Sequence, residues 1–332
     1  MDQTPPTSTS TMRAITQSRY GTSDVLRLAD VPVPRPGEGQ VLLRVHAAGL
    51  DRGTEHLMTG KPYAVRLAMG VRRPRNPVLG RDVAGTVAET GPGVTRFAPG
   101  DEVYGVAPGS FAQYAVADVD KLATKPAALS YAEAAVVPIS AGTALQAVRD
   151  AATVTSGQSV LITGASGGVG SYAVQLAVAA GAEVTAACSL TKRDHVTALG
   201  AQHVLDYARD DWADGSERYD VILDIAGNPS LRRLRRALTP HGTAVFVGGE
   251  QSGSMTGMGR QIRGTMLSPF IGATLKILLA RERGADYEQL AELLEAGRCR
   301  PVLDRTYPLE QAAEAMRKLE EGAIRGKVAI TT

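Results

Sequence analysis

The chain has 332 residues, a length that exceeds what one hydrophobic core usually organises and that predicts two domains. Its 36 basic and 34 acidic residues leave a formal net charge of +2, which excludes a broadly basic nucleic-acid-binding surface. No apolar run reaches membrane-spanning length, and only two cysteines are present. We therefore expect a cytoplasmic protein with no disulfide framework, no nucleic-acid partner and no membrane partner.

The first eleven residues are polar and rich in Pro, Thr and Ser, and they lack the apolar stretch of a signal peptide. This composition predicts a disordered segment over residues 1–11. Short β-like runs at 41–45, 83–87, 102–104 and 111–116 then alternate with Gly and Pro. Runs of this kind predict a compact, mostly antiparallel β domain over residues 12–136.

Residues 159–170 combine a short apolar run, a glycine-rich turn and the start of a helix. The turn reads Ala-x-Gly-x-x-Gly, with Ala165 where a dinucleotide-binding turn more often has its first glycine. Glycines let the backbone approach a pyrophosphate, and the free N–H groups of the helix start favour its negative charge. The alternative is a tight strand–helix turn without a ligand.

Alternating strands and helices continue through residues 137–264, with strands expected at 183–188, 203–205, 220–224 and 243–247. This alternation predicts a doubly wound parallel sheet, an α/β fold that binds ligands at the carboxyl ends of its strands. It therefore favours a ligand-binding turn over an empty one. The last stretch, 265–332, reads as helical and ends in a short strand, and we expect it to return to the first domain.

The end of the second strand predicts which nicotinamide cofactor is used. NAD-binding units place Asp or Glu there, whereas this chain has no carboxylate before Asp194. The hydroxyl of Ser189 and the cations of Lys192 and Arg193 suit the 2′-phosphate of NADPH. In the alternative interpretation, the two cations are only the solvated start of a helix.

Several motifs along the chain resemble one family. They are Gly60-Lys61-Pro62-Tyr63, Asn76 to Gly85, Phe97 to Val103, Gly142 to Leu145, Gly164 to Gly170 and Arg325 to Val328. In these motifs the chain is similar to the medium-chain dehydrogenase/reductase superfamily, in its zinc-independent, quinone-oxidoreductase-like branch, close to the reticulon-4-interacting-protein group. The resemblance implies a GroES-like first domain, a Rossmann domain inserted after it, and NADPH held between them.

The resemblance and the residue patterns together give a set of expected cofactor-binding residues. These are Thr143, Ser166, Gly167, Gly168, Val169, Ser189, Lys192, Tyr207, Gly248, Phe270, Ile324, Arg325 and Gly326.

The zinc ligands of related alcohol dehydrogenases are replaced in this chain. Asp51 aligns with their Cys, and Arg81-Asp82 aligns with their His-Glu pair. An arginine stays protonated and cannot ligate a metal, and the histidines show no ligand spacing. We therefore expect no zinc.

Without a metal, a quinone or an α,β-unsaturated carbonyl is the favoured hydride acceptor, because its negative charge spreads onto a distant oxygen. Tyr63 is the candidate proton or hydrogen-bond donor, and Asp51 is a candidate relay or orienting group. In the alternative interpretations, Tyr63 is a packing side chain and Asp51 is a loop cap or the partner of Arg52 or Arg81. Lys192 and Asp210 also resemble the proton-donor pair of enoyl reductases in the superfamily.

The sequence thus predicts an NADPH-dependent oxidoreductase acting on a small quinone or enone. Two alternatives remain open: an enoyl reductase for one biosynthetic intermediate, and an NADPH-binding sensor or scaffold with little turnover. The residues also leave open whether the chain acts alone or as a homodimer.

Overall fold

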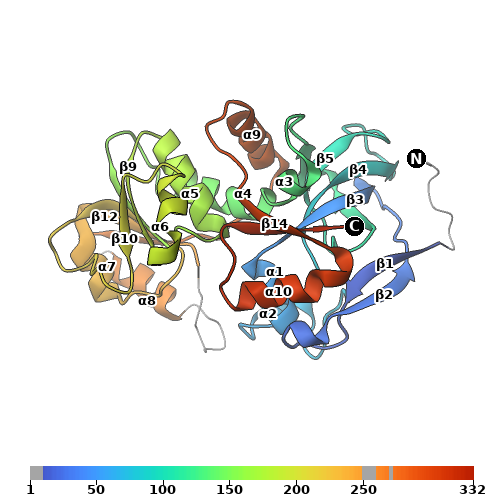
Figure 1. Cartoon of the computed structure of the whole chain (residues 1–332), viewed down its shortest axis with the longest axis horizontal. Coiled ribbons are helices and arrows are strands. Elements are labelled where there is room, and N and C mark those ends of the chain that lie inside the picture. The colour runs from blue at the N-terminus through green and yellow to red at the C-terminus, as the bar shows by residue number, and fades with distance from the viewer. Residues whose placement is uncertain (1–9, 249–258, 269–271) are drawn as a thin grey trace. The chain divides into compact units, whose positions relative to one another are not determined.

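The computed structural model describes residues 10–248, 259–268 and 272–332 of the chain (Figure 1). The described residues form two compact units. Unit 1 contains those of Met1–Ile139, Glu282–Ala296 and Pro301–Thr332, and unit 2 contains those of Ser140–Arg281 and Gly297–Arg300. Within these residues, no helix has the length and apolar character needed to cross a bilayer.

Unit 1 is built mainly from antiparallel strands. Its strands are β1 (Thr11–Thr16), β2 (Arg27–Pro32), β3 (Gln40–Leu50), β4 (Asp82–Thr90), β5 (Glu102–Val106), β6 (Tyr114–Asp118), β7 (Leu122–Thr124), β14 (Leu303–Pro308) and β15 (Lys327–Thr331). Its helices are α1 (Arg52–Thr59), α2 (Val65–Met69), α3 (Tyr131–Ala135), α9 (Gly284–Glu295) and α10 (Ala312–Glu320).

The main sheet of unit 1 has the strand order β14-β15-β3-β4-β5-β7, with β6 also paired to β3. All of its strand pairs except β14–β15 are antiparallel. The long strand β3 buries Val41, Leu43 and Val45 in one cluster and Ala48 and Leu50 in another. The C-terminal strand β15, drawn in red, pairs with β3, drawn in blue, in this sheet (Figure 1).

Unit 2 is a parallel sheet with helices between its strands. The strands are β8 (Ser159–Thr163), β9 (Glu183–Cys188), β10 (His203–Asp206), β11 (Tyr219–Asp224), β12 (Leu238–Phe246) and β13 (Thr274–Ile277). The helices are α4 (Pro138–Gln146), which begins at the end of unit 1, α5 (Gly168–Ala179), α6 (Arg193–Thr197), α7 (Leu231–Ala237) and α8 (Gly259–Leu267).

The parallel sheet has the order β10-β9-β8-β11-β12-β13, with neighbouring β8 and β11 at its centre. From β8 the chain builds outward to β9 and β10, and from β11 outward to β12 and β13, so the order reverses between these two central strands. Ligands of such folds bind at the carboxyl ends of the strands near this reversal. Leu161 and Ile222 are fully buried, as expected for strands covered on both faces.

The predicted fold class, an antiparallel β domain with a doubly wound parallel-sheet domain, is confirmed. The element bounds differ from the predicted domain limits in two places. Thr11 begins β1, one residue before the predicted domain start at Met12. The parallel sheet extends past residue 264 to β13, because a strand of four residues carries too short a pattern to be recognised.

Candidate functional site

The glycine-rich turn lies between β8 and α5, as the sequence predicts. Gly164 has φ +67°, a conformation that glycine adopts without strain. A Cβ on Gly170 would lie 2.1 Å from the carbonyl oxygen of Gly164, so a side chain there would not fit. Gly167 caps α5 without a side-chain hydrogen bond, which leaves the first N–H groups of the helix for a ligand. The turn therefore fits a pyrophosphate.

The predicted ligand-binding edge of the sheet continues at β11 and β12. The hydroxyl of Thr163, at the end of β8, accepts a hydrogen bond of 3.0 Å from the backbone N–H of Ile225. A Cβ on Gly248 would lie 2.0 Å from the carbonyl oxygen of Ile225. These contacts bring the ends of three neighbouring strands together. Phe270, the other expected residue from this part of the chain, lies outside the described residues.

A pocket of about 200 Å³ lies where β9 and β10 end. Its lining residues are Cys188, Ser189, Leu190, Arg193, Val204, Leu205, Asp206, Arg209 and Asp210. Burial and the charge of Asp206 raise the pKa of the Cys188 thiol, whereas Lys192 and Arg193 act to lower it. Both cations therefore act on the pocket. Tyr207 follows β10 and is 66% exposed, which leaves its ring accessible.

Sequence reasoning did not place Arg209 or Asp206 in this pocket, because they come from the next strand and its following turn. It had already paired Asp210 with Lys192, by resemblance to the proton-donor pair of enoyl reductases. Asp210 accepts a hydrogen bond of 2.7 Å from the backbone N–H of Asp206. The similarity of Asp210 to a proton-donating residue remains a prediction, and its carboxylate here stabilises the turn. Ligands of parallel sheets bind at the carboxyl ends of the strands, and applying this rule to β10 could have identified Arg209 and Asp206.

The remaining cofactor-binding residues are divided between the two units. Thr143 lies on α4 in unit 2 and is half-buried. Ile324, Arg325 and Gly326 immediately precede β15 in unit 1, where Ile324 is 8% exposed and Gly326 has φ +76°. Their contacts with a cofactor stay predictions.

A buried cluster of three charged side chains forms where β15, β4 and the end of β3 meet. Lys327 Nζ lies 2.9 Å from Asp82 Oδ2 and 3.5 Å from Asp51 Oδ2. Asp82 also accepts a hydrogen bond of 2.8 Å from the backbone N–H of Ile139. All three side chains are at least nine-tenths buried. We call Asp51, Asp82 and Lys327 the buried triad.

The triad holds two carboxylates against one ammonium, and the pKa values reflect this imbalance. Burial raises the pKa of Asp82 to about 6, although Lys327 opposes the shift. Burial also acts to raise the pKa of Asp51, but Lys327 and the hydrogen bonds from Thr54 hold it below its ordinary value. Burial lowers the pKa of Lys327, and the two carboxylates more than offset this effect.

Asp51 caps the start of helix α1, whereas the capping alternative that the sequence left open was a loop cap. Its Oδ1 accepts a hydrogen bond of 2.7 Å from the backbone N–H of Thr54 at the start of α1. Its ion-pair partner is Lys327 rather than the two arginines considered from the sequence. Arg52 pairs with Glu55, and Arg81 pairs with Glu282. Sequence reasoning missed Lys327, whose only local signal is a charge at the start of an apolar strand.

The side chains at the place of the zinc ligands do not fit a zinc ion. Asp51 and Asp82 are already paired with an ammonium, and the guanidinium of Arg81 affects the pKa of Asp51. A further cation would meet two fixed positive charges. Within the described ranges, no three His, Cys, Asp or Glu side chains gather in a way that could hold a metal.

Tyr63 lies between α1 and α2 and is 51% exposed. The guanidinium of Arg66 lies 4.8 Å from the centre of its ring and 4.5 Å from the ring of Tyr20. The Tyr63 ring is thus held on one face by a cation while half of its surface faces solvent. Arg66 is a second residue that the sequence analysis did not identify.

Comparison with known proteins places both parts of the chain in described families. Residues 37–127 match the family described as "Alcohol dehydrogenase GroES-like domain". Residues 199–330 match the family described as "Zinc-binding dehydrogenase".

Three curated relatives are similar over nearly the whole chain. The NAD(P)H oxidoreductase RTN4IP1, mitochondrial, of Danio rerio is 32% identical, over 94% of this chain and 89% of the relative. A chloroplastic quinone-oxidoreductase homolog of Spinacia oleracea is 32% identical, over 96% and 98%. A 2-methylene-furan-3-one reductase of Solanum lycopersicum is 31% identical, over 97% and 79%.

Among solved structures, the quinone oxidoreductase from Coxiella burnetii superposes with a TM-score of 0.86 at 28% identity. The match covers 97% of this chain and 100% of that one. The relatives from zebrafish and spinach are named as organellar proteins, so the cytoplasmic location of this chain stays a prediction.

Proposed function

The chain belongs to the medium-chain dehydrogenase/reductase superfamily, in its zinc-independent, quinone-oxidoreductase-like branch, and on this premise we propose that it reduces a quinone or an α,β-unsaturated carbonyl with NADPH. The observation that carries the proposal is the buried triad, which puts protein charges where related alcohol dehydrogenases hold a metal.

The cofactor is proposed to bind along the carboxyl ends of the strands of unit 2. The backbone from Ser166 to Val169 would hold the pyrophosphate at the start of α5. Ser189, Lys192 and Tyr207 would hold the 2′-phosphate end beside the pocket at β9 and β10. The chemistry that bound NADPH supplies is hydride donation.

The choice of acceptor follows from the charges in unit 1. Hydride exchange with a simple alcohol or ketone needs an electrophile that stabilises a localised alkoxide, a task that a zinc ion performs in metal-dependent relatives. The carboxylates of the buried triad are already paired with the Lys327 ammonium, so these side chains do not fit such an ion. A quinone or enone needs less help because the negative charge spreads over the conjugated system.

Tyr63 is the proposed donor of a hydrogen bond or proton to the oxygen of the acceptor. Its half-exposed ring and the fixed cation of Arg66 support this role, because a nearby positive charge favours the developing phenolate. Asp51 is proposed as a positioning residue, since its carboxylate caps the helix that leads to Tyr63.

A turnover assay tests the proposal. We expect purified protein to oxidise NADPH, followed at 340 nm, with quinones and enones, and to keep its activity after treatment with a chelator. Turnover with enoyl thioesters alone would favour the enoyl reductase alternative. Binding of NADPH without turnover of any acceptor would favour the sensor. Efficient oxidation of simple alcohols with NADP, lost on chelation, would contradict the proposal.

A further inference from the structure

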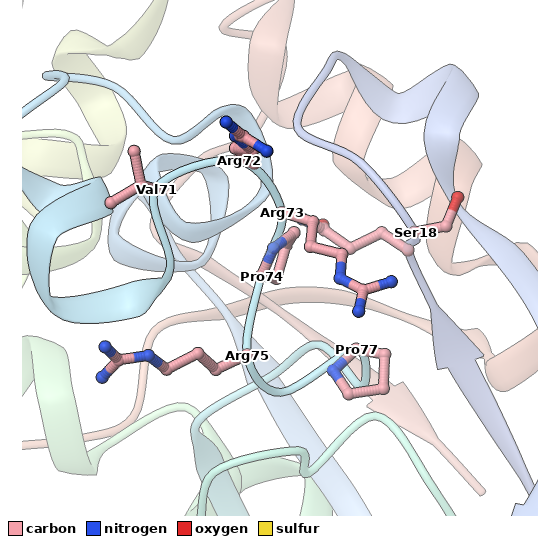
Figure 2. Close-up of a pocket in the computed structure, with 8 residues that line it drawn as sticks. Ser18, Val71, Arg72, Arg73, Pro74, Arg75 and Pro77 are labelled. Atoms are coloured by element: carbon pink, nitrogen blue, oxygen red, sulfur yellow. The ribbon is translucent and has the colours of Figure 1, made fainter.

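Unit 1 contains a pocket of about 580 Å³ that the proposed chemistry does not use (Figure 2). Its lining residues are Gln17, Ser18, Val71, Arg72, Arg73, Pro74, Arg75 and Pro77. The loop that forms most of it is closed tightly, because the backbone N–H of Arg75 donates to the carbonyl of Met69 over 2.8 Å. A Cβ on Gly70 would lie 2.1 Å from the carbonyl oxygen of Arg73, so the turn requires glycine.

The charged side chains that line the pocket are all positive. Residues 60–80 contain five Lys or Arg side chains and no Asp or Glu. Arg72, Arg73 and Arg75 are exposed, and none of them forms an ion pair with any residue that the structure describes. Arg75 donates from Nη1 to the carbonyl of Ala68 over 3.2 Å, so Arg72 and Arg73 are the guanidinium groups most available to an anion. Such groups bind phosphate or carboxylate oxygens through two parallel hydrogen bonds.

The three arginines do not point the same way. Figure 2 shows the Arg73 guanidinium on the side of the loop that faces Ser18 and Pro77, whereas the Arg75 side chain extends from the opposite side. Arg73 is thus the residue placed to contact a ligand in the pocket. Arg75 adds positive charge at longer range.

A buried acceptor completes the lining. Gln17 is 3% exposed, and its amide nitrogen donates to the carbonyl of Met58 over 3.3 Å. Its Oε1 is buried and has no hydrogen-bond partner among the described residues. Leaving such an atom unpaired is costly, so a ligand with an N–H or O–H donor would find a matching acceptor here.

The pocket is connected to Tyr63 by a short series of contacts. Tyr63 and Tyr20 both stack on Arg66, and the Tyr20 hydroxyl donates to the carbonyl of Gly70 over 2.6 Å. Gly70 begins the loop that carries Arg72, Arg73 and Arg75. Between Tyr63 and this loop, Leu67 is 74% exposed, and Val71 at the pocket is 66% exposed. Apart from Arg66 against the Tyr63 ring, the stretch between Tyr63 and the pocket therefore exposes the apolar side chains of Leu67 and Val71, and the exposed arginines follow at the pocket.

We propose that this pocket binds the anionic end of the acceptor, so that the substrates are conjugated carbonyls or quinones with a phosphate or carboxylate remote from the reacting carbon. The inference rests on the proposed function and adds a substrate class to it. Arg73 contacts the anion, Gln17 accepts from a neighbouring donor group, and the exposed apolar side chains cover the hydrocarbon between the two ends.

The test compares three acceptors that share one conjugated ketone and one chain length, ending in a phosphate monoester, a carboxylate or an uncharged alcohol. We expect kcat/KM at low salt to be at least tenfold higher for an anionic acceptor than for the alcohol. The phosphate and carboxylate arms show which anion is preferred. Arg73→Ala should remove the preference through KM and leave the alcohol unaffected, while Arg73→Lys keeps part of it.

Arg235→Ala, at an exposed arginine of α7, is the matched control and should change nothing. Equal kcat/KM for all three acceptors, or a preference that survives Arg73→Ala, would overturn the inference while leaving the proposed function intact. If no acceptor is reduced, the proposed function fails instead. Calorimetry with inorganic pyrophosphate and NADP-saturated protein then decides on the pocket: binding that is lost in Arg73→Ala supports it, and absence of binding overturns it.

Discussion

The Lys327 ammonium lies 2.9 Å from the Asp82 carboxylate, with both side chains almost completely removed from solvent. The two residues begin β4 and β15, the strands that lie on either side of β3 in the main sheet of unit 1. The pair therefore joins distant parts of the chain in the interior of unit 1.

Replacing Lys327 with Met should destabilise the protein strongly. The change leaves Asp51 and Asp82 buried together without a counter-charge, and breaking a buried pair in this way costs about 3–5 kcal/mol. Urea unfolding measures the loss in free energy of unfolding. Lys318→Met removes an exposed pair with Glu321 that solvent screens, and it should change the free energy of unfolding far less. Similar stabilities for the two variants would show that the triad is energetically unimportant.

The free energy of unfolding should depend on pH between 4 and 6 because of the raised pKa of Asp82. Burial raises the pKa of this carboxyl from its ordinary 3.8 to about 6, so the folded chain binds more protons than the unfolded chain in this range. The stabilising contribution of Asp82 is then fully present below its unfolded pKa of 3.8 and is lost as the pH rises through its folded pKa of about 6.

Asp82→Asn removes this dependence. Compared with the wild type, the variant should therefore gain stability as the pH rises from 4 to 6, by at most about 1.4 kcal/mol per pH unit. Urea titrations of both proteins at several pH values measure the difference. The lowered pKa of Asp51 acts at more acidic pH and does not interfere. A difference that stays constant across the range would contradict the assignment.

Lys192→Glu should weaken NADPH binding far more than NADH binding. The substitution puts a negative charge beside the pocket at the ends of β9 and β10, where the 2′-phosphate is proposed to lie. Fluorescence titration with both cofactors measures the ratio of the dissociation constants. Arg232→Glu, on exposed α7, is the control for a general change in charge. Tighter NADH than NADPH binding by the unaltered protein would refute the cofactor assignment.

Tyr63→Phe should lower kcat about ten- to a hundredfold, which corresponds to about 1.4–2.7 kcal/mol of lost transition-state stabilisation. The ring and its contact with Arg66 are kept, so the dissociation constant for NADPH should not change. Steady-state kinetics with a good acceptor give the result. Tyr114→Phe, on β6, controls for the loss of a hydroxyl elsewhere in unit 1. Unchanged kcat would show that Tyr63 is a packing side chain and not a donor to the acceptor.

Features encoded by neighbouring residues could be predicted from the sequence. The strand, turn and helix at residues 159–170 need only local spacing, and they are found in the structure. A capping role for Asp51 was among the alternatives, but as a loop cap, whereas the structure shows it at the start of helix α1.

Features that depend on tertiary contacts could not be predicted. Lys327 and Asp82 are 245 positions apart, and no local pattern links a lysine at the start of one strand to an aspartate at the start of another. The same applies to the pocket at β9 and β10, where Asp206 comes from a different strand than Ser189. The strand alternation predicted the sheet but not which charges would meet at its edge.

The pairing of β15 with β3 sets the order in which the two units can be completed during synthesis. The main part of unit 2 is one continuous stretch, Ser140–Arg281, and all of its parallel strands are synthesised before β14 and β15. Until Lys327 emerges, the growing chain must keep Asp51 and Asp82 hydrated or protonated, because their counter-charge has not yet been made. Of the two units, unit 1 is therefore begun before unit 2 and completed after it.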